Sequence, residues 1–195
     1  MKKNVWNILY LTPPHVLRYC KKCGKKTEFF SSGLFRVNAQ RKYLDIWLIY
    51  KCNCCETTWN ATVSSRVTPQ SVPSGLLEKY TNNDRDLAEK YAMNIDFLHK
   101  NGAEIVLPDY RIDGDCLQDQ KVQLLEIKNQ FPLPVKLSAI IRKKLNLSQK
   151  QYLNVIESEK IRSALPLDLH KYKLKDSIIL EIHDYPFCDK THSEP

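Results

Sequence analysis

The sequence is poor in glycine, with five glycines among 195 residues. It therefore has little material for the glycine-rich loops that cradle phosphates or dinucleotides, and neither fingerprint occurs. The H-E-x-x-H motif of metalloproteases and the G-x-S-x-G motif of hydrolases are missing as well. We predict that the protein is not an enzyme, and we identify neither catalytic residues nor a small-molecule substrate.

Long apolar runs are also lacking, and we expect no secretion signal. No stretch approaches the ~18 consecutive apolar residues of a membrane-spanning helix, so we expect no membrane association. The first ten residues are basic and then partly apolar, but Asn4 and Asn7 interrupt them and no small-residue cleavage site follows. We therefore expect a cytoplasmic protein with reduced cysteines.

Four of the seven cysteines form two C-x2-C pairs, Cys20 with Cys23 and Cys52 with Cys55. This spacing is typical of a structural zinc site with four cysteine ligands. Four thiolates leave no open coordination position, so the metal would stabilise the fold and take no part in catalysis. We predict that these four residues hold one structural Zn²⁺.

These cysteines also have other interpretations. Cys54 stands beside both residues of the second pair and can replace either, although the two-residue spacer favours Cys52 with Cys55. Iron held by four cysteines is not distinguished from zinc by spacing alone. Two disulfides conflict with a reducing compartment, and a redox C-x-x-C would lie between a strand and a helix, which neither pair does.

The residues around both pairs predict strands. Residues 44–50 and 57–63 are rich in β-branched and aromatic side chains, and residues 15–19 and 25–30 flank the first pair. A strand, a cysteine turn and a second strand, used twice, is the layout of a zinc ribbon. We therefore predict an antiparallel zinc ribbon over residues 1–75.

The remaining chain predicts helices and strands in two further segments. In residues 76–130, an acidic middle, we expect a helix at 83–100 and strands at 104–107 and 122–128. In residues 131–183 we expect a hairpin of two helices, 136–147 and 148–160, the second opening on a capping box of Ser148 and Gln151. A turn that leads into a terminal strand, together at 172–182, and a loose tail at 184–195 follow. The predicted class is α+β: an N-terminal zinc ribbon, a mixed α/β middle and a C-terminal helical hairpin with small strands.

The net charge of +8 is unevenly distributed. Residues 1–75 hold 12 Lys and Arg against 3 Asp and Glu, residues 76–130 hold 7 against 11, and residues 131–195 hold 11 against 8. Two basic ends favour contacts with a polyanion. The candidate phosphate-binding residues are Lys21, Lys22, Lys25, Arg36, Arg41, Lys136, Arg142, Lys143, Lys150 and Lys160.

Three aromatic residues lie among the basic residues of the ribbon. Phe35, Tyr43 and Trp47 are placed to stack on bases, but apolar residues that alternate along a strand more often belong to a core. The sequence leaves both interpretations open.

Residues 136–182 resemble the RNA-binding module named after ribosomal protein S-four. The matching pieces are Lys136-Leu, the run Arg142–Ser148, the helix end Val155–Ile161 and the segment Lys173–Ile179. The family usually has arginine where this chain has Gln149, and glycine where it has Glu159. The resemblance implies two short helices and a small hairpin that present a basic face to structured RNA.

Over its whole length the chain also resembles a bacterial family known only as a domain of unknown function. The shared segments are Arg18–Gly24, Phe35–Ala39, Leu44–Cys52 and Thr58–Asn60. This resemblance implies no activity.

These patterns together predict a zinc-stabilised protein that binds structured or ribosome-associated RNA through the ribbon and the C-terminal hairpin. The alternative is an adaptor without nucleic acid, in which the edge of the ribbon docks a strand of a partner protein.

Overall fold

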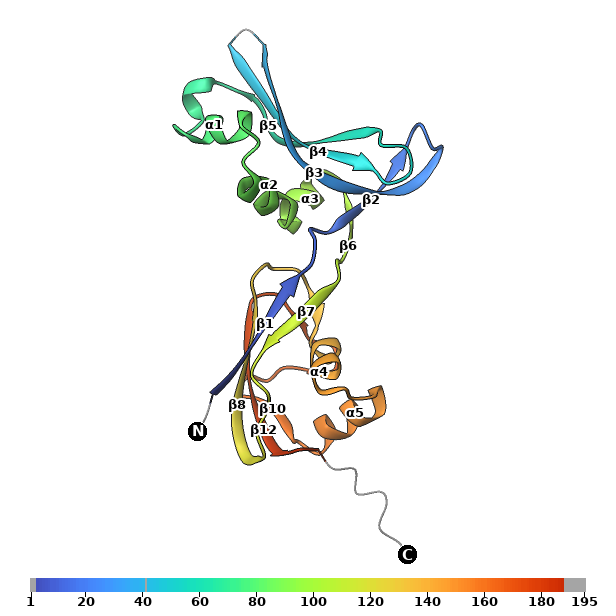
Figure 1. Ribbon diagram of the computed structural model, residues 1–195, viewed down its shortest axis with the longest axis vertical. Coiled ribbons are helices and arrows are strands. Elements are labelled where there is room, and N and C mark those ends of the chain that lie inside the picture. The colour runs from blue at the N-terminus through green and yellow to red at the C-terminus, as the bar shows by residue number, and fades with distance from the viewer. Residues whose placement is uncertain (1–2, 41, 188–195) are drawn as a thin grey trace, which may run out of the picture. The chain divides into compact units, whose positions relative to one another are not determined.

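The computed structural model describes residues 3–40 and 42–187 of the chain (Figure 1). Of the described residues, 46% lie in strands and 22% in helices, so the protein is mostly β and the predicted α+β class is wrong. Two compact units divide the chain: residues 10–109 form the insert unit, and residues 1–9 with 110–195 form the terminal unit. These divisions differ from the predicted boundaries near residues 75 and 130.

The insert unit contains one antiparallel sheet of five strands in the order β5-β4-β3-β2-β6. Its strands are β2 (His15–Cys20), β3 (Lys25–Gln40), β4 (Tyr43–Cys52), β5 (Thr58–Val67) and β6 (Glu104–Val106). The helical elements are η1 (Pro69–Ser71), α1 (Leu76–Thr81), α2 (Arg85–Ala92) and α3 (Ile95–Lys100). The single helix expected at 83–100 is two helices, because the Asn94 side chain accepts the Phe97 N–H and begins α3 there.

Helices α1–α3 cover one face of this sheet. Strand β4 alternates strictly: Leu44, Ile46, Leu48, Tyr50 and Cys52 are buried, and the residues between them are exposed or half-buried. Apart from Leu44, these buried side chains share a core with residues of all three helices. Phe35 completes it, with ring centroids 5.0 Å from Tyr80 and 6.0 Å from Tyr91. The other side chains of β4 therefore point to a face that these helices leave open.

The terminal unit is built around a mixed sheet in the order β10-β12-β8-β1-β7 (Figure 1). Its strands are β1 (Lys3–Tyr10), β7 (Tyr110–Gly114), β8 (Gln120–Asn129), β10 (Ile161–Ser163) and β12 (Ser177–Tyr185). Strand β1 runs parallel to β8, with Lys3 opposite Leu124, whereas β12 runs antiparallel to β8 and β10 to β12. A two-stranded sheet joins β9 (Val135–Lys136) to β11 (Lys173–Leu174).

Helices α4 (Leu137–Leu145) and α5 (Gln149–Glu157) belong to this unit, and α5 has the predicted capping box. The predicted C-terminal helical hairpin with small strands is wrong, because these helices share their unit with a five-stranded sheet. The buried side chains of the sheet alternate along its strands, as in Trp6 and Ile8 of β1 and Leu125 and Ile127 of β8. The sequence predicted that the first residues belong to the zinc ribbon of residues 1–75. In the structure, β1 instead pairs with β8, more than a hundred residues away.

Strand β7 lies so close to β1 that only glycine fits at one position. A Cβ atom on Gly114 would stand 2.0 Å from the carbonyl oxygen of Val5, and the backbone φ there is +131°. Gly114 therefore allows the close approach of the two backbones. Within residues 3–40 and 42–187, no helix is both long and apolar enough to span a bilayer.

Candidate metal centre and the helix-free sheet face

The four predicted ligands come from two turns at the same end of the insert sheet. Cys20 ends β2, with Cys23 in the turn that follows, and Cys52 ends β4, with Cys55 in its turn. Strand β3 pairs with both β2 and β4, and Phe29 lies opposite Cys52, so the turns stand side by side. Strand pairing thus brings together cysteines that are some thirty residues apart in the sequence.

The sulfur atoms have the spacing of a tetrahedral site. The four Sγ atoms all lie within 4.8 Å of one another, with 3.5 Å between Cys20 and Cys55 and 3.9 Å between Cys23 and Cys52. Zinc–sulfur bonds of about 2.3 Å place tetrahedral ligands about 3.8 Å apart. The residues present therefore fit a metal ion with four thiolate ligands.

The position of Cys54 was left open by the sequence. Its side chain is exposed, and it is not a member of the cluster of four that the described residues contain. The cluster therefore consists of the two C-x2-C pairs. Cys116 is exposed in the terminal unit, and Cys188 lies outside the described residues.

The two cysteine turns have the same backbone geometry. Gly24 donates its N–H to the Cys20 carbonyl at 2.9 Å, and Glu56 donates to the Cys52 carbonyl at 3.0 Å. Gly24 has φ +68° and Glu56 has φ +57°, so both are left-handed. The sequence hid this equivalence, because glycine marks such a position only in the first turn.

Replacing Glu56 with glycine is expected to raise the free energy of unfolding by about 1 kcal/mol, because the left-handed conformation costs an L-residue about 1–2 kcal/mol. The matched variant Gly24→Ala is expected to lower it by about 1 kcal/mol, since a Cβ there meets no atom within 4 Å and only the backbone conformation is penalised. Urea unfolding of the metal-loaded protein measures both. A destabilised Glu56→Gly variant would contradict the equivalence of the turns.

A threonine hydroxyl lies next to each cysteine of the second pair. The Thr27 Oγ1 atom lies 3.3 Å from the Sγ of Cys52, and a hydrogen bond of 3.2 Å joins Cys55 Sγ to Thr57 Oγ1. The Thr27 hydroxyl lowers the pKa of Cys52 to about 6, and Thr57 lowers the pKa of Cys55. Hydrogen bonds from neighbouring thiols, chiefly Cys55, raise the pKa of Cys23. Both shifts favour the thiolate form, which is the form that binds a metal ion.

The predicted phosphate-binding residues of the insert unit lie in two places. Lys21, Lys22 and Lys25 are exposed around the first cysteine turn. Arg36 is exposed on β3, opposite Trp47 of β4. Arg41 lies outside the described residues.

The structure separates the three aromatic residues that the sequence grouped. Phe35 is buried against the helices, so base stacking by Phe35 is excluded. Tyr43 is 43% exposed and Trp47 is half-buried, and both point away from the buried side chains of β4. Of the three, therefore, Tyr43 and Trp47 face the helix-free side of the sheet and Phe35 does not.

In the terminal unit, two of the predicted phosphate-binding residues make internal contacts. Arg142 donates to the Leu147 carbonyl at 3.3 Å and to the Gln149 side chain at 2.8 Å. Lys143 donates to the Tyr110 carbonyl and lies 4.5 Å from the centroid of the Tyr110 ring. Lys136 and Lys150 are exposed, and Lys160 is half-buried. The basic end of α4 is thus engaged largely with its own unit.

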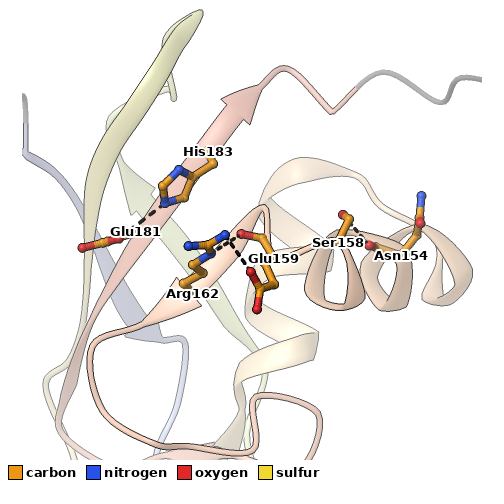
Figure 2. Close-up of polar contacts among 6 residues, drawn as sticks. All are labelled: Asn154, Ser158, Glu159, Arg162, Glu181 and His183. Carbon is orange, nitrogen blue, oxygen red and sulfur yellow. Dashed lines mark hydrogen bonds and ion pairs between the residues drawn. The ribbon is translucent and has the colours of Figure 1, made fainter.

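The turn from α5 into β10 contains the position where the S-four-type module has glycine. Figure 2 shows Arg162 donating from Nε to the Glu159 carbonyl, at 2.9 Å, and pairing with its carboxylate at 2.7 Å. Glu159 has φ +55°, which favours glycine. Nearby, His183 Nε2 lies 3.4 Å from a Glu181 carboxylate oxygen (Figure 2). The resemblance to the S-four-type module stays a prediction.

A groove on the helix-free face was missed by the sequence analysis. It measures about 1070 Å³ and is lined by Gln40, Lys42, Tyr43, Asp45, Trp47, Ser65 and Arg66. Strand alternation separates the two faces of β4 in the sequence. It does not tell which face the helices cover, so no sequence pattern marked the groove.

The fold and the cysteine cluster define a mostly β protein of two units with a candidate four-thiolate metal centre. A family model described as a protein of unknown function, DUF1062, matches residues 37–166, and the chain belongs to this family. The matched region includes Cys52 and Cys55 and begins after Cys20 and Cys23. Searches of curated proteins and of solved structures found no significant match.

Proposed function

We propose that this protein binds RNA through a sheet whose turns are held by structural zinc. The observation that carries the proposal is the helix-free face of the insert sheet, where Tyr43 and Trp47 lie beside Arg36, Lys42 and Arg66. Aromatic platforms combined with cations are how many proteins hold unpaired nucleotides.

The distribution of charge within the insert unit supports this proposal. Residues 10–75, which contain four of its strands, hold 10 Lys and Arg against 3 Asp and Glu. Residues 76–109, which contain α1–α3 and β6, hold 4 against 7. The positive charge therefore belongs mainly to the strands and their turns, and the helices do not supply it. A polyanion would be attracted to the sheet side of the unit.

Zinc is the metal we propose for the cysteine cluster. Four thiolates in a tetrahedral arrangement suit zinc, and iron is the other metal that this ligand set accepts. With four protein ligands the metal has no open position, so its role is to clamp the two turns together. Metal analysis of the purified protein distinguishes zinc from iron.

Binding to a labelled RNA pool is expected at low salt and is expected to weaken steeply as salt rises. For about four phosphate contacts with a single strand, raising the salt from ~50 to ~200 mM weakens binding about 50-fold, because condensed counterions are released. Fluorescence anisotropy at several salt concentrations measures this, together with the 260/280 nm absorbance ratio after low-salt purification. No binding at the lowest salt would refute the proposal.

An adaptor that docks a partner strand on the edge of the sheet has less support. The edge strand β5 is already covered at its centre, because the Asn101 side chain accepts the Thr62 N–H at 2.6 Å and donates to the Thr62 carbonyl at 3.1 Å. The other edge strand, β6, has only three residues. A salt-insensitive complex with a protein and no nucleic acid would favour the adaptor.

A further inference from the structure

The groove on the helix-free face of the insert sheet owes its form to irregular pairing between β4 and β5. The register shifts between Leu44 and Ile46 and again between Ile46 and Trp47. Asp45 Oδ1 fixes this irregular segment by accepting the Ser65 hydroxyl and the Arg66 N–H, both at 2.9 Å. Arg66 itself is left-handed, with φ +54°. Specific hydrogen bonds therefore hold together three residues that line the groove, Asp45, Ser65 and Arg66.

Two aromatic side chains provide flat surfaces in the groove. Tyr43 and Trp47 both belong to β4 and lie on the same face, because they are four positions apart and side chains alternate along a strand. At about 3.3 Å per residue their backbone positions are about 13 Å apart. They are thus two separate stacking surfaces along an extended ligand.

Three cations surround these aromatic rings. Arg36 stands directly across from Trp47 on β3, Lys42 lines the groove, and the Arg66 guanidinium lies 5.8 Å from the centroid of the Tyr43 ring. Within the described part of the chain, none of the three forms an ion pair with an acidic side chain. Among the described residues that line the groove, Asp45 is the one acidic side chain, and it accepts hydrogen bonds from Ser65 and Arg66 of β5. The cations are thus available to an anionic ligand.

We propose that this groove is a binding site for single-stranded RNA, with bases stacked on Trp47 and Tyr43 and phosphates held by Arg36, Lys42 and Arg66. The inference rests on the proposed RNA-binding function and names its site and substrate class. Single strands are favoured over duplexes, because a base must leave its partner to expose its face to an aromatic ring. Gln40 lies at the same surface and offers an amide to base edges.

The volume and the charge of the groove both favour single-stranded RNA as its ligand. A volume of about 1070 Å³ slightly exceeds the usual range for sites that enclose small ligands, which is about 300–1,000 Å³, and suits an extended chain. Stacking surfaces alone would suit many planar ligands. Three cations alongside them are complementary to a repeated phosphate backbone.

The test measures binding of a fluorescein-labelled oligouridine of about ten nucleotides by anisotropy. Trp47→Ala is expected to raise the dissociation constant between about 5- and 100-fold, because stacking of one base on an aromatic ring is lost. Trp47→Phe keeps a ring and is expected to retain most of the affinity. Tyr19→Ala removes an aromatic side chain that is 66% exposed outside the groove, and is expected to leave binding unchanged.

The cations are tested through the salt dependence of binding. Arg36→Ala with Arg66→Ala is expected to reduce the slope of log K against log salt by about 1.4, at about 0.7 for each phosphate contact on a single strand. Arg85→Ala is the matched control, because Arg85 is exposed on α2, whose buried residues contact the other face of the sheet. It is expected to leave the slope unchanged. Metal content and thermal unfolding confirm that each variant is folded.

The possible outcomes distinguish the proposal that the groove is the binding site from the broader proposal that the protein binds RNA. If the wild-type protein binds the oligouridine and folded Trp47→Ala binds equally well, the groove is not the site, and RNA binding itself stands. Preference of the wild-type protein for a duplex of the same length would also overturn the groove. If no RNA of any form binds, both proposals are refuted.

Discussion

Cys52→Ser is expected to abolish metal binding and to unfold the insert unit. Cys52 and Cys20 are 0% and 1% exposed, and both belong to the hydrophobic core that contains Phe29 and Tyr50. The cluster is therefore continuous with the core of the sheet. Apparent binding energies of structural zinc sites, about 10–16 kcal/mol, match or exceed the total stability of a typical domain, about 5–15 kcal/mol.

Metal content and circular dichroism of the purified variant measure this effect. Chelation of the wild-type protein is expected to have the same result, because the two cysteine turns then lose the ion that joins them. Cys54→Ser is the matched control: it removes the exposed neighbouring thiol and is expected to keep one metal ion per chain. A Cys52→Ser variant that retains one metal ion and wild-type stability would disprove the assigned ligand set.

Trp6→Ala is expected to destabilise the terminal unit by about 4 kcal/mol, within the range of about 3–5 kcal/mol for truncating a large buried aromatic side chain. Trp6 is 0% exposed in β1, between β8 and β7 in the sheet, and its indole Nε1 donates to the Asp115 carbonyl at 2.8 Å. Truncation leaves both a cavity and an unpaired carbonyl.

Urea unfolding measures the effect, and metal content reports on the insert unit separately. We expect the metal to be retained, because the insert unit has its own core and Trp6 does not belong to it. Asn7→Ala is the matched control, since Asn7 is the next residue of β1 and is exposed. A loss of less than about 1 kcal/mol for Trp6→Ala would place it among ordinary surface substitutions and contradict the buried position of β1.

Local patterns in the sequence predicted the cysteine cluster and much of the secondary structure. Two C-x2-C pairs flanked by β-branched and aromatic residues predicted ligands at strand ends, and the four sulfur atoms are found together there. Ser148 and Gln151 predicted the start of α5, and the capping box is present. Each C-x2-C pair, and likewise the capping box, involves residues within a few positions of one another, so the sequence displays these features directly.

Features that depend on distant residues were not accessible in this way. The parallel pairing of β1 with β8 joins residues more than a hundred positions apart, and no local pattern distinguishes it from a ribbon strand. The left-handed conformation of Glu56 was hidden because the residue there is not glycine. The predicted fold class was wrong for the same reason. Helices α4 and α5 were predicted to form a hairpin, and the pairing of distant strands into the five-stranded sheet of their unit was not predicted.

The sequence by itself determined which residues can bind a metal and which side chains alternate along β4. Only the tertiary structure decided the roles of the aromatic residues, placing Phe35 in the core and Tyr43 with Trp47 on the open face. The physical reason is that alternation divides a strand into two faces, and burial of one face depends on what packs against it. In this protein helices α1–α3, which follow β5 in the chain, pack against one face of the sheet and bury it.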